Sequence, residues 1–142
     1  LKASNHNIDH FNRVVHLLKG RIPIMAGETP FYVVFLAMGA DGGMIGNACL
    51  MPRYVVRMYE LVKEGKVDEA LAAHRKLFPL TDALAAGPYF SSFKEMMSLI
   101  GFDCGKPLLP LLPVSEANFA RVREEFEKLR ADGTFKDEAF PA

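Results

Sequence analysis

The chain has 142 residues, 50% of them apolar, which is enough for one domain with a sizeable hydrophobic core. Lys plus Arg and Asp plus Glu each number 17, so the formal net charge is zero and no basic surplus favours nucleic acid or an anionic membrane as a partner. Gly, Pro or charge interrupts every apolar run within about a dozen residues, too few to span a bilayer. Cys49 and Cys104 lie far apart and predict two free thiols in a reducing cytoplasm.

The first part of the chain alternates between predicted strands and predicted helices. Asn5 or Asn7 can cap the first helix, because a short polar side chain accepts hydrogen bonds from free backbone N–H groups. Thr29 can cap the second helix, with Pro30 at its first helical position. The predicted strands cover residues 1–4, 22–26 and 42–45.

The remainder of the chain is predicted to be helical, with Ser115 capping the last helix. Strands that alternate with helices imply parallel strands joined by right-handed crossovers. Three parallel strands make a poor sheet alone, because both faces of a parallel sheet need covering. Since the chain also begins at Leu1 rather than Met, we expect it to be the C-terminal part of a longer protein. The predicted helices cover residues 52–64, 67–84, 90–100 and 116–129, and a proline-rich connector covers 101–113.

Lys2 is the strongest catalytic candidate. A lysine at the end of a barrel strand points into an active site, and in a partly desolvated pocket it can attack a carbonyl to form a Schiff base. His6 and His10 are spaced as two metal ligands on one helix face, but no third ligand has suitable spacing, so no metal site is predicted. Cys49 could be a nucleophile, although no histidine is placed to activate it and a buried thiol is the simpler interpretation. Met44, Met51 and Met58 are predicted to be core residues rather than cofactor contacts.

Several segments together resemble the dihydrodipicolinate synthase / N-acetylneuraminate lyase family. The order and spacing of these segments are more specific than any one of them. The resemblance implies an α/β fold, namely the C-terminal part (strands 6–8) of a (β/α)8 TIM barrel at residues 1–65, with a C-terminal helical extension at residues 66–142. The matching segments are Leu1-Lys2-Ala3-Ser4, the loop that begins at Gly27, Gly39-Ala40-Asp41-Gly42-Gly43-Met44-Ile45 followed by Pro52, residues 59–70 and residues 107–111.

The resemblance also implies site residues. Lys2 would form an imine with pyruvate or another 2-oxo acid, and no cofactor is expected. Met44 and Ile45 would lie near the pyruvyl group. The distal part of the substrate would meet Gly27, Glu28 and Thr29.

Two departures from the family pattern bear on the substrate. The family's usual Asn after strand 8 is replaced by Cys49. Thr29 occupies the position where sialic-acid lyases carry an acidic residue, which argues against a sialic-acid substrate. Glu28 supplies a nearby carboxylate, so a polar or hydroxylated substrate is still open.

Three functions follow from these residues as alternatives. The leading one is a class I lyase or aldolase that acts on pyruvate plus an aldehyde, or on a longer 2-oxo acid. The second is a dehydratase of a deoxy sugar acid on the same scaffold, and the third is a non-catalytic barrel subunit. The family's proton-shuttling tyrosine and carboxylate-binding loop belong to the first half of the barrel. We therefore expect an N-terminal barrel half as partner, and then homo-oligomers of complete barrels, either tetramers or dimers.

Overall fold

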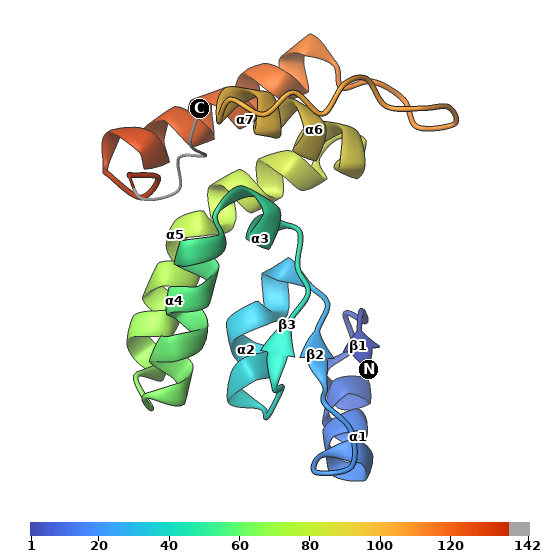
Figure 1. The fold of residues 1–142 in the computed structure, drawn as a ribbon, viewed down its shortest axis with the longest axis vertical. Helices are drawn as coiled ribbons and strands as arrows, with labels where there is room; N and C mark the ends of the chain where they lie inside the picture. Colours follow the sequence, from blue (N-terminus) through green and yellow to red (C-terminus); the bar gives the residue numbers. More distant parts are fainter. Residues whose placement is uncertain (137–142) are drawn as a thin grey trace. The chain divides into compact units, whose positions relative to one another are not determined.

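A computed structural model describes residues 1–136, and the chain divides into two compact units, Leu1–Lys76 and Leu77–Ala142 (Figure 1). The first unit is a mixed α/β structure and the second is helical. The last helix to begin in the first unit, α5, contains the boundary between the units. The division expected at residues 65 and 66, between barrel and extension, stays a prediction.

Three short parallel strands form the sheet of the first unit, in the order β1-β2-β3. Each strand pairs in register, with Lys2 opposite Met25 and Met25 opposite Gly42. The predicted alternation and parallel pairing are confirmed. The strands are β1 (Lys2–Ala3), β2 (Met25–Ala26) and β3 (Gly42–Gly43), and the connecting helices are α1 (Ile8–Leu18), η1 (Thr29–Phe31) and α2 (Tyr32–Ala37).

The second strand is shorter than the residues 22–26 predicted for it. The backbone N–H groups of Arg21 and Ile22 donate to the carbonyl of Leu18 at 2.9 and 3.2 Å, in the turn that ends α1. The N–H groups of Arg21 and Ile22 are therefore not available to pair β2 with a neighbouring strand. Pro23 has no N–H group to offer a neighbouring strand.

One face of the sheet is covered by helices of the first unit. Ala3 and Ala26 on this face are buried, and the ring of Tyr32 from α2 packs so closely over Gly43 that a β-carbon there would overlap it. The other face carries Lys2, Met25 and Gly42, which are exposed or half-buried. Neighbouring residues of a strand point to opposite faces, so this division follows from the register.

The helices after the sheet form near their predicted positions. Ser115 caps α7 as expected and accepts a hydrogen bond from the Asn118 N–H at 3.2 Å. Asn7 caps the earlier helix α1 in the same way and accepts one from the His10 N–H at 3.1 Å. In the second unit, Ser91 and Lys94 hold the proline-rich connector through bonds to backbone carbonyls. The predicted helices are α4 (Pro52–Lys63), α5 (Val67–Ala85), α6 (Tyr89–Leu99) and α7 (Glu116–Ala131). A further short helix that was not predicted, α3 (Asn47–Leu50), precedes them.

The expectations for the Thr29 cap and for the burial of Met44 are wrong. Thr29 does not cap a helix, because the chain enters a 3₁₀ turn there and the N-cap residue is Glu28, without a side-chain cap bond. Met44 is not a core residue but is 57% exposed, because it follows β3 on the uncovered side of the sheet. Met51 and Met58 are buried, as predicted.

At the amino edge of the sheet, an ion pair between Lys19 and Asp41 joins the end of α1 to β3. Asp41 also accepts a hydrogen bond from the Ile24 N–H at 2.9 Å, and Lys19 donates to the Gly39 carbonyl at 2.8 Å. The bond from Lys19 and then the Ile24 N–H hold the pKa of Asp41 below its ordinary value of 3.8. The contribution of Asp41 to stability is therefore complete above about pH 4 and is lost as the pH falls through the lowered pKa.

We expect Asp41→Asn to lower the melting temperature at neutral pH and to flatten its fall in acid, because the substitution removes the ionised acceptor. Thermal unfolding of the chain together with its N-terminal barrel half, followed by circular dichroism between about pH 2 and 7, measures both effects. Asp9→Asn is the matched control, since Asp9 pairs with Arg13 only along the exposed face of α1. Equal pH profiles for the two variants would contradict this role of Asp41.

Thr29 gives a second prediction. It is 6% exposed, and within residues 1–136 its hydroxyl has no hydrogen-bond partner. Replacing a buried hydroxyl that makes no bond by a methyl group removes a desolvation penalty, so Thr29→Val should raise the free energy of unfolding by about 1 kcal/mol. Denaturant unfolding of the chain together with its N-terminal barrel half measures the change. Thr81→Val, at a buried threonine that has an interaction partner, should instead lower stability. A loss of stability in Thr29→Val would show that the hydroxyl is used.

Candidate functional site

The predicted site residues follow three neighbouring parallel strands. Gly27, Glu28 and Thr29 come directly after β2, and Met44 and Ile45 directly after β3. The ladder continues past the strand ends, because the Gly27 N–H donates to the Ala3 carbonyl at 2.9 Å and the Met44 N–H donates to the Ala26 carbonyl at 2.8 Å. The structure therefore brings these residues to the same carboxyl edge as Lys2, which lies on β1.

Lys2 leans across its neighbouring strand towards Gly27. A β-carbon at residue 27 would lie 2.9 Å from the Lys2 Cε and 2.7 Å from the Ala3 carbonyl oxygen, and it would overlap the Ser4 hydroxyl. Only glycine fits here without moving the backbone. Met25 crosses Gly42 in the same way, with its Cε 2.8 Å from a β-carbon there. Glycine at residue 27 thus makes room for the aliphatic part of the candidate nucleophile.

Glu28 is held by a histidine from the preceding loop. The Nε2 of His6 lies 3.0 Å from the Oε2 of Glu28, and their side chains are 74% and 23% exposed. The spacing of His6 and His10 in the sequence suggests only a pair of metal ligands. Its actual partner is 22 residues away along the chain, and a single sequence carries no signal for such a pair.

The other predicted residues lie close by but differ in accessibility. Thr29 is buried, and its carbonyl oxygen lies 2.8 Å from the Nε2 of His74. Ile45 is buried, whereas Met44 is exposed beside the open face. Of the five predicted substrate contacts, Glu28 and Met44 therefore present side chains towards solvent in the described part of the chain.

Tyr32 is the tyrosine nearest to the sheet, but it lies on the face opposite Lys2. Its hydroxyl is 3.4 Å from the Val55 carbonyl oxygen. Burial, and to a lesser extent the neighbouring Tyr59, raise the pKa of Tyr32 to about 12. Tyr32 is therefore directed away from the face of the sheet that carries Lys2.

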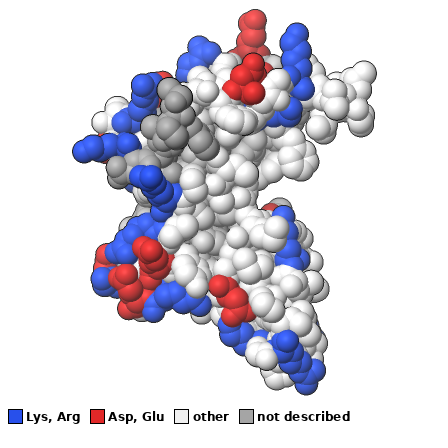
Figure 2. Space-filling view, in the orientation of Figure 1, with Lys and Arg blue, Asp and Glu red and all other residues white. Residues whose placement is uncertain are grey.

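The surface of the described residues shows no further charged or metal-binding site on the face in view. In Figure 2 acidic and basic side chains are interspersed on the face in view, in keeping with the zero net charge. Residues 1–136 contain no group of three or more His, Cys, Asp or Glu side chains able to hold a metal ion. Within the same range, no helix has the length and apolar character needed to cross a bilayer.

Cys49 is exposed, so the interpretation of a buried thiol is wrong for this residue.

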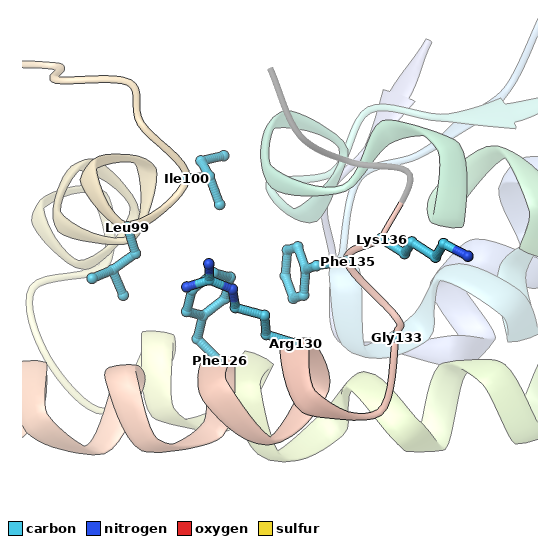
Figure 3. Close-up of a pocket in the computed structure, with 7 residues that line it drawn as sticks. All are labelled: Leu99, Ile100, Phe126, Arg130, Gly133, Phe135 and Lys136. Carbon is cyan, nitrogen blue, oxygen red and sulfur yellow. The ribbon is translucent and has the colours of Figure 1, made fainter. Parts of the chain in front are cut away.

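A separate pocket of about 610 Å³ lies in the second unit (Figure 3). Apolar side chains form most of it, with the basic side chains of Arg130 and Lys136 beside them. Its described lining includes no carboxylate, histidine or thiol that could act as acid, base or nucleophile, so it offers no catalytic chemistry of its own. The lining residues are Leu99, Ile100, Phe126, Arg130, Gly133, Phe135 and Lys136.

Comparison with known proteins connects this geometry to a family. Residues 1–129 match the dihydrodipicolinate synthetase family. A protein of Pyrobaculum islandicum described as an uncharacterized DapA-like lyase is 32% identical over 141 residues, which cover 93% of this chain and 46% of that protein. The 4-hydroxy-tetrahydrodipicolinate synthase of Archaeoglobus fulgidus is 26% identical over 129 residues, which cover 91% of this chain and 45% of the relative.

A solved structure shows the same fold. The 4-hydroxy-tetrahydrodipicolinate synthase of Methylacidiphilum fumariolicum SolV aligns with a TM-score of 0.86 and 24% identity, over 99% of this chain and 47% of that structure. The chain therefore spans about half the length of the relatives it matches. The match to the family extends over residues 1–129 and includes all three strands and every predicted site residue. The chain belongs to the dihydrodipicolinate synthetase family.

Proposed function

We propose that the protein is a class I lyase or aldolase in which Lys2 forms an imine with pyruvate or another 2-oxo acid. The observation that carries this proposal is the position of Lys2 at the carboxyl edge of a parallel sheet, exposed on the uncovered face and packed against Gly27. Barrels of this kind place their catalytic groups at that edge. Membership of a family whose relatives include DapA-like lyases supports the same chemistry.

The reaction follows from the amine. The uncharged Nζ of Lys2 attacks the C2 carbonyl carbon, two protons move to the carbonyl oxygen, and water leaves as the C=N bond forms. Once protonated, the imine accepts the electron pair of the breaking C3–C4 bond, while the C4 hydroxyl loses its proton and becomes an aldehyde. The enamine that remains takes a proton at C3, and water then releases pyruvate and restores the amine. Condensation is the reverse sequence.

The alternative of a dehydratase shares the imine and differs in the bond that breaks. In a dehydratase the electrons released by loss of a C3 proton expel a hydroxyl group from C4 as water. Free pyruvate and an aldehyde indicate cleavage, whereas an unsaturated 2-oxo acid with all its carbons indicates dehydration. Glu28 favours hydroxylated substrates in both cases, because an ionised carboxylate accepts hydrogen bonds from hydroxyl groups.

Trapping tests the nucleophile. With the complete barrel, pyruvate and borohydride should leave a reduced, covalent adduct on Lys2, because hydride converts the imine into a stable secondary amine. Mass spectrometry of the peptide that contains Lys2 measures it, and Lys19, paired with Asp41, is the internal control. Lys2→Arg should abolish trapping, because a guanidinium stays protonated at any working pH. An unmodified Lys2 peptide from the wild-type protein would refute the proposal.

We further propose that an N-terminal barrel half completes the site and that whole barrels then form homo-oligomers. β1 and β3 are the two edge strands of the sheet, and edge strands expose backbone groups that pair with other strands. The uncovered face carries Lys2, Met25 and Gly42, and a parallel sheet is stable when both faces are covered. General acid and base groups would come from that half.

The chain expressed alone should therefore associate or aggregate. Sedimentation velocity at several concentrations measures this, and co-expression with the complementary half should replace the associated material by a defined complex. A monodisperse monomer of the isolated chain, stable over the whole concentration range, would count against the need for a partner half.

A further inference from the structure

A line of aromatic rings links the hydrophobic core of the first unit to the carboxyl edge of the sheet. Phe11 and Phe35 stack with ring centroids 3.8 Å apart, and Phe31 stacks on Phe35 at 5.5 Å. The ring of His6 follows at 5.8 Å from Phe31, tilted by 53°. Phe11 and Phe35 are fully buried, whereas His6 is exposed. The imidazole of His6 therefore packs against an aromatic ring that is itself stacked on the buried core.

The same imidazole is bonded to Glu28. The Nε2 of His6 lies 3.0 Å from the Oε2 of Glu28, so an Nε2–H group donates to the carboxylate. Glu28 follows Gly27, the residue against which the Lys2 side chain packs, and consecutive α-carbons lie about 3.8 Å apart. Glu28 therefore belongs to the loop that follows β2, one residue beyond the glycine on which the Lys2 side chain packs.

We propose that His6 is a positioning residue that holds the Glu28 carboxylate to receive the hydroxyl groups of the substrate's distal part. This inference rests on the proposed function, since it takes Lys2 as the residue that binds the 2-oxo acid. A carboxylate has about four lone-pair positions, so one bond to His6 leaves acceptors for substrate hydroxyls. An unheld glutamate would have to lose rotamer freedom when the substrate binds, and a carboxylate fixed beforehand avoids that cost.

The Glu28 carboxylate also determines which charge the distal group of the substrate can carry. An ionised carboxylate attracts hydroxyl and ammonium donors and repels a second anion. An apolar distal group makes no hydrogen bond with the carboxylate and gains nothing from its orientation. The substrate class that fits is therefore a 2-oxo acid with a neutral, hydroxylated chain, formed from pyruvate and a hydroxyaldehyde.

The test uses the active protein, in which this chain is joined by the strands that complete its barrel. Condensation of pyruvate is measured with glyceraldehyde and with propanal as acceptors, and kcat and KM are determined for each. His6→Phe keeps a ring against Phe31 but cannot donate to Glu28. We expect it to lower kcat/KM for glyceraldehyde relative to propanal about tenfold, mainly through a higher KM, which is typical for the loss of one hydrogen bond to a charged group.

Further variants separate positioning from folding. Glu28→Gln should shift the acceptor ratio in the same direction, and His6→Gln, which retains an N–H donor, should recover most of the loss. His10→Phe and His10→Gln are matched controls on an exposed histidine of α1 and should leave the ratio unchanged. In the His6 and His10 variants, borohydride trapping of pyruvate on Lys2 should equal that of the wild type, because the imine forms away from the distal group.

The outcomes distinguish the two proposals. A lower acceptor ratio with intact trapping in His6→Phe supports the positioning role. An unchanged ratio, or an equal loss for both acceptors, overturns that role while leaving the imine chemistry in place. If the wild-type protein forms no pyruvate adduct, the proposed function fails, and the inference fails with it.

Discussion

The close approach of β1 and β2 at Gly27 is the constraint on which the candidate site depends. The Gly27 N–H bonds to the Ala3 carbonyl at 2.9 Å, and the Lys2 side chain lies over the same glycine. A side chain at residue 27 would meet backbone atoms of the neighbouring strand and would push the strands apart. The absence of a side chain at residue 27 therefore permits two contacts. It allows the backbone hydrogen bond that pairs β1 with the chain after β2, and it leaves room for the Lys2 side chain.

The features that depend on local sequence could be predicted from it. Asn7 and Ser115 cap their helices as expected, because a cap needs only a short polar side chain and the N–H groups that follow. The parallel order of the strands also follows from alternation along the chain. The resemblance to the family was carried by the order of several such segments, and the family is confirmed over residues 1–129.

Features that depend on contacts between distant residues could not be predicted in the same way. The length of β2 is set by a turn that uses the donors of Arg21 and Ile22 first. Thr29 carries a favourable capping side chain, yet it is buried in a 3₁₀ turn where His74 lies next to its carbonyl. The pairing of His6 with Glu28 joins loops 22 residues apart, and no periodicity or spacing in a single sequence encodes it. Met44 is exposed because it follows β3 on the face of the sheet that residues 1–136 leave uncovered, and no local pattern in the sequence marks that face.

The ion pair of Lys19 with Asp41 lies at the amino edge of the sheet, and the predicted site residues lie at the carboxyl edge. Interactions that hold β2, β3 and α1 together at one end are thus separate from the loops that would meet a substrate at the other. Substitutions at Glu28 and Met44 should therefore have little effect on the ion pair between Lys19 and Asp41 at the opposite edge of the sheet. Such a division makes the scaffold suited to divergence, in which an ancestral chemistry is retained while new substrate ranges arise by changes at a few loop residues.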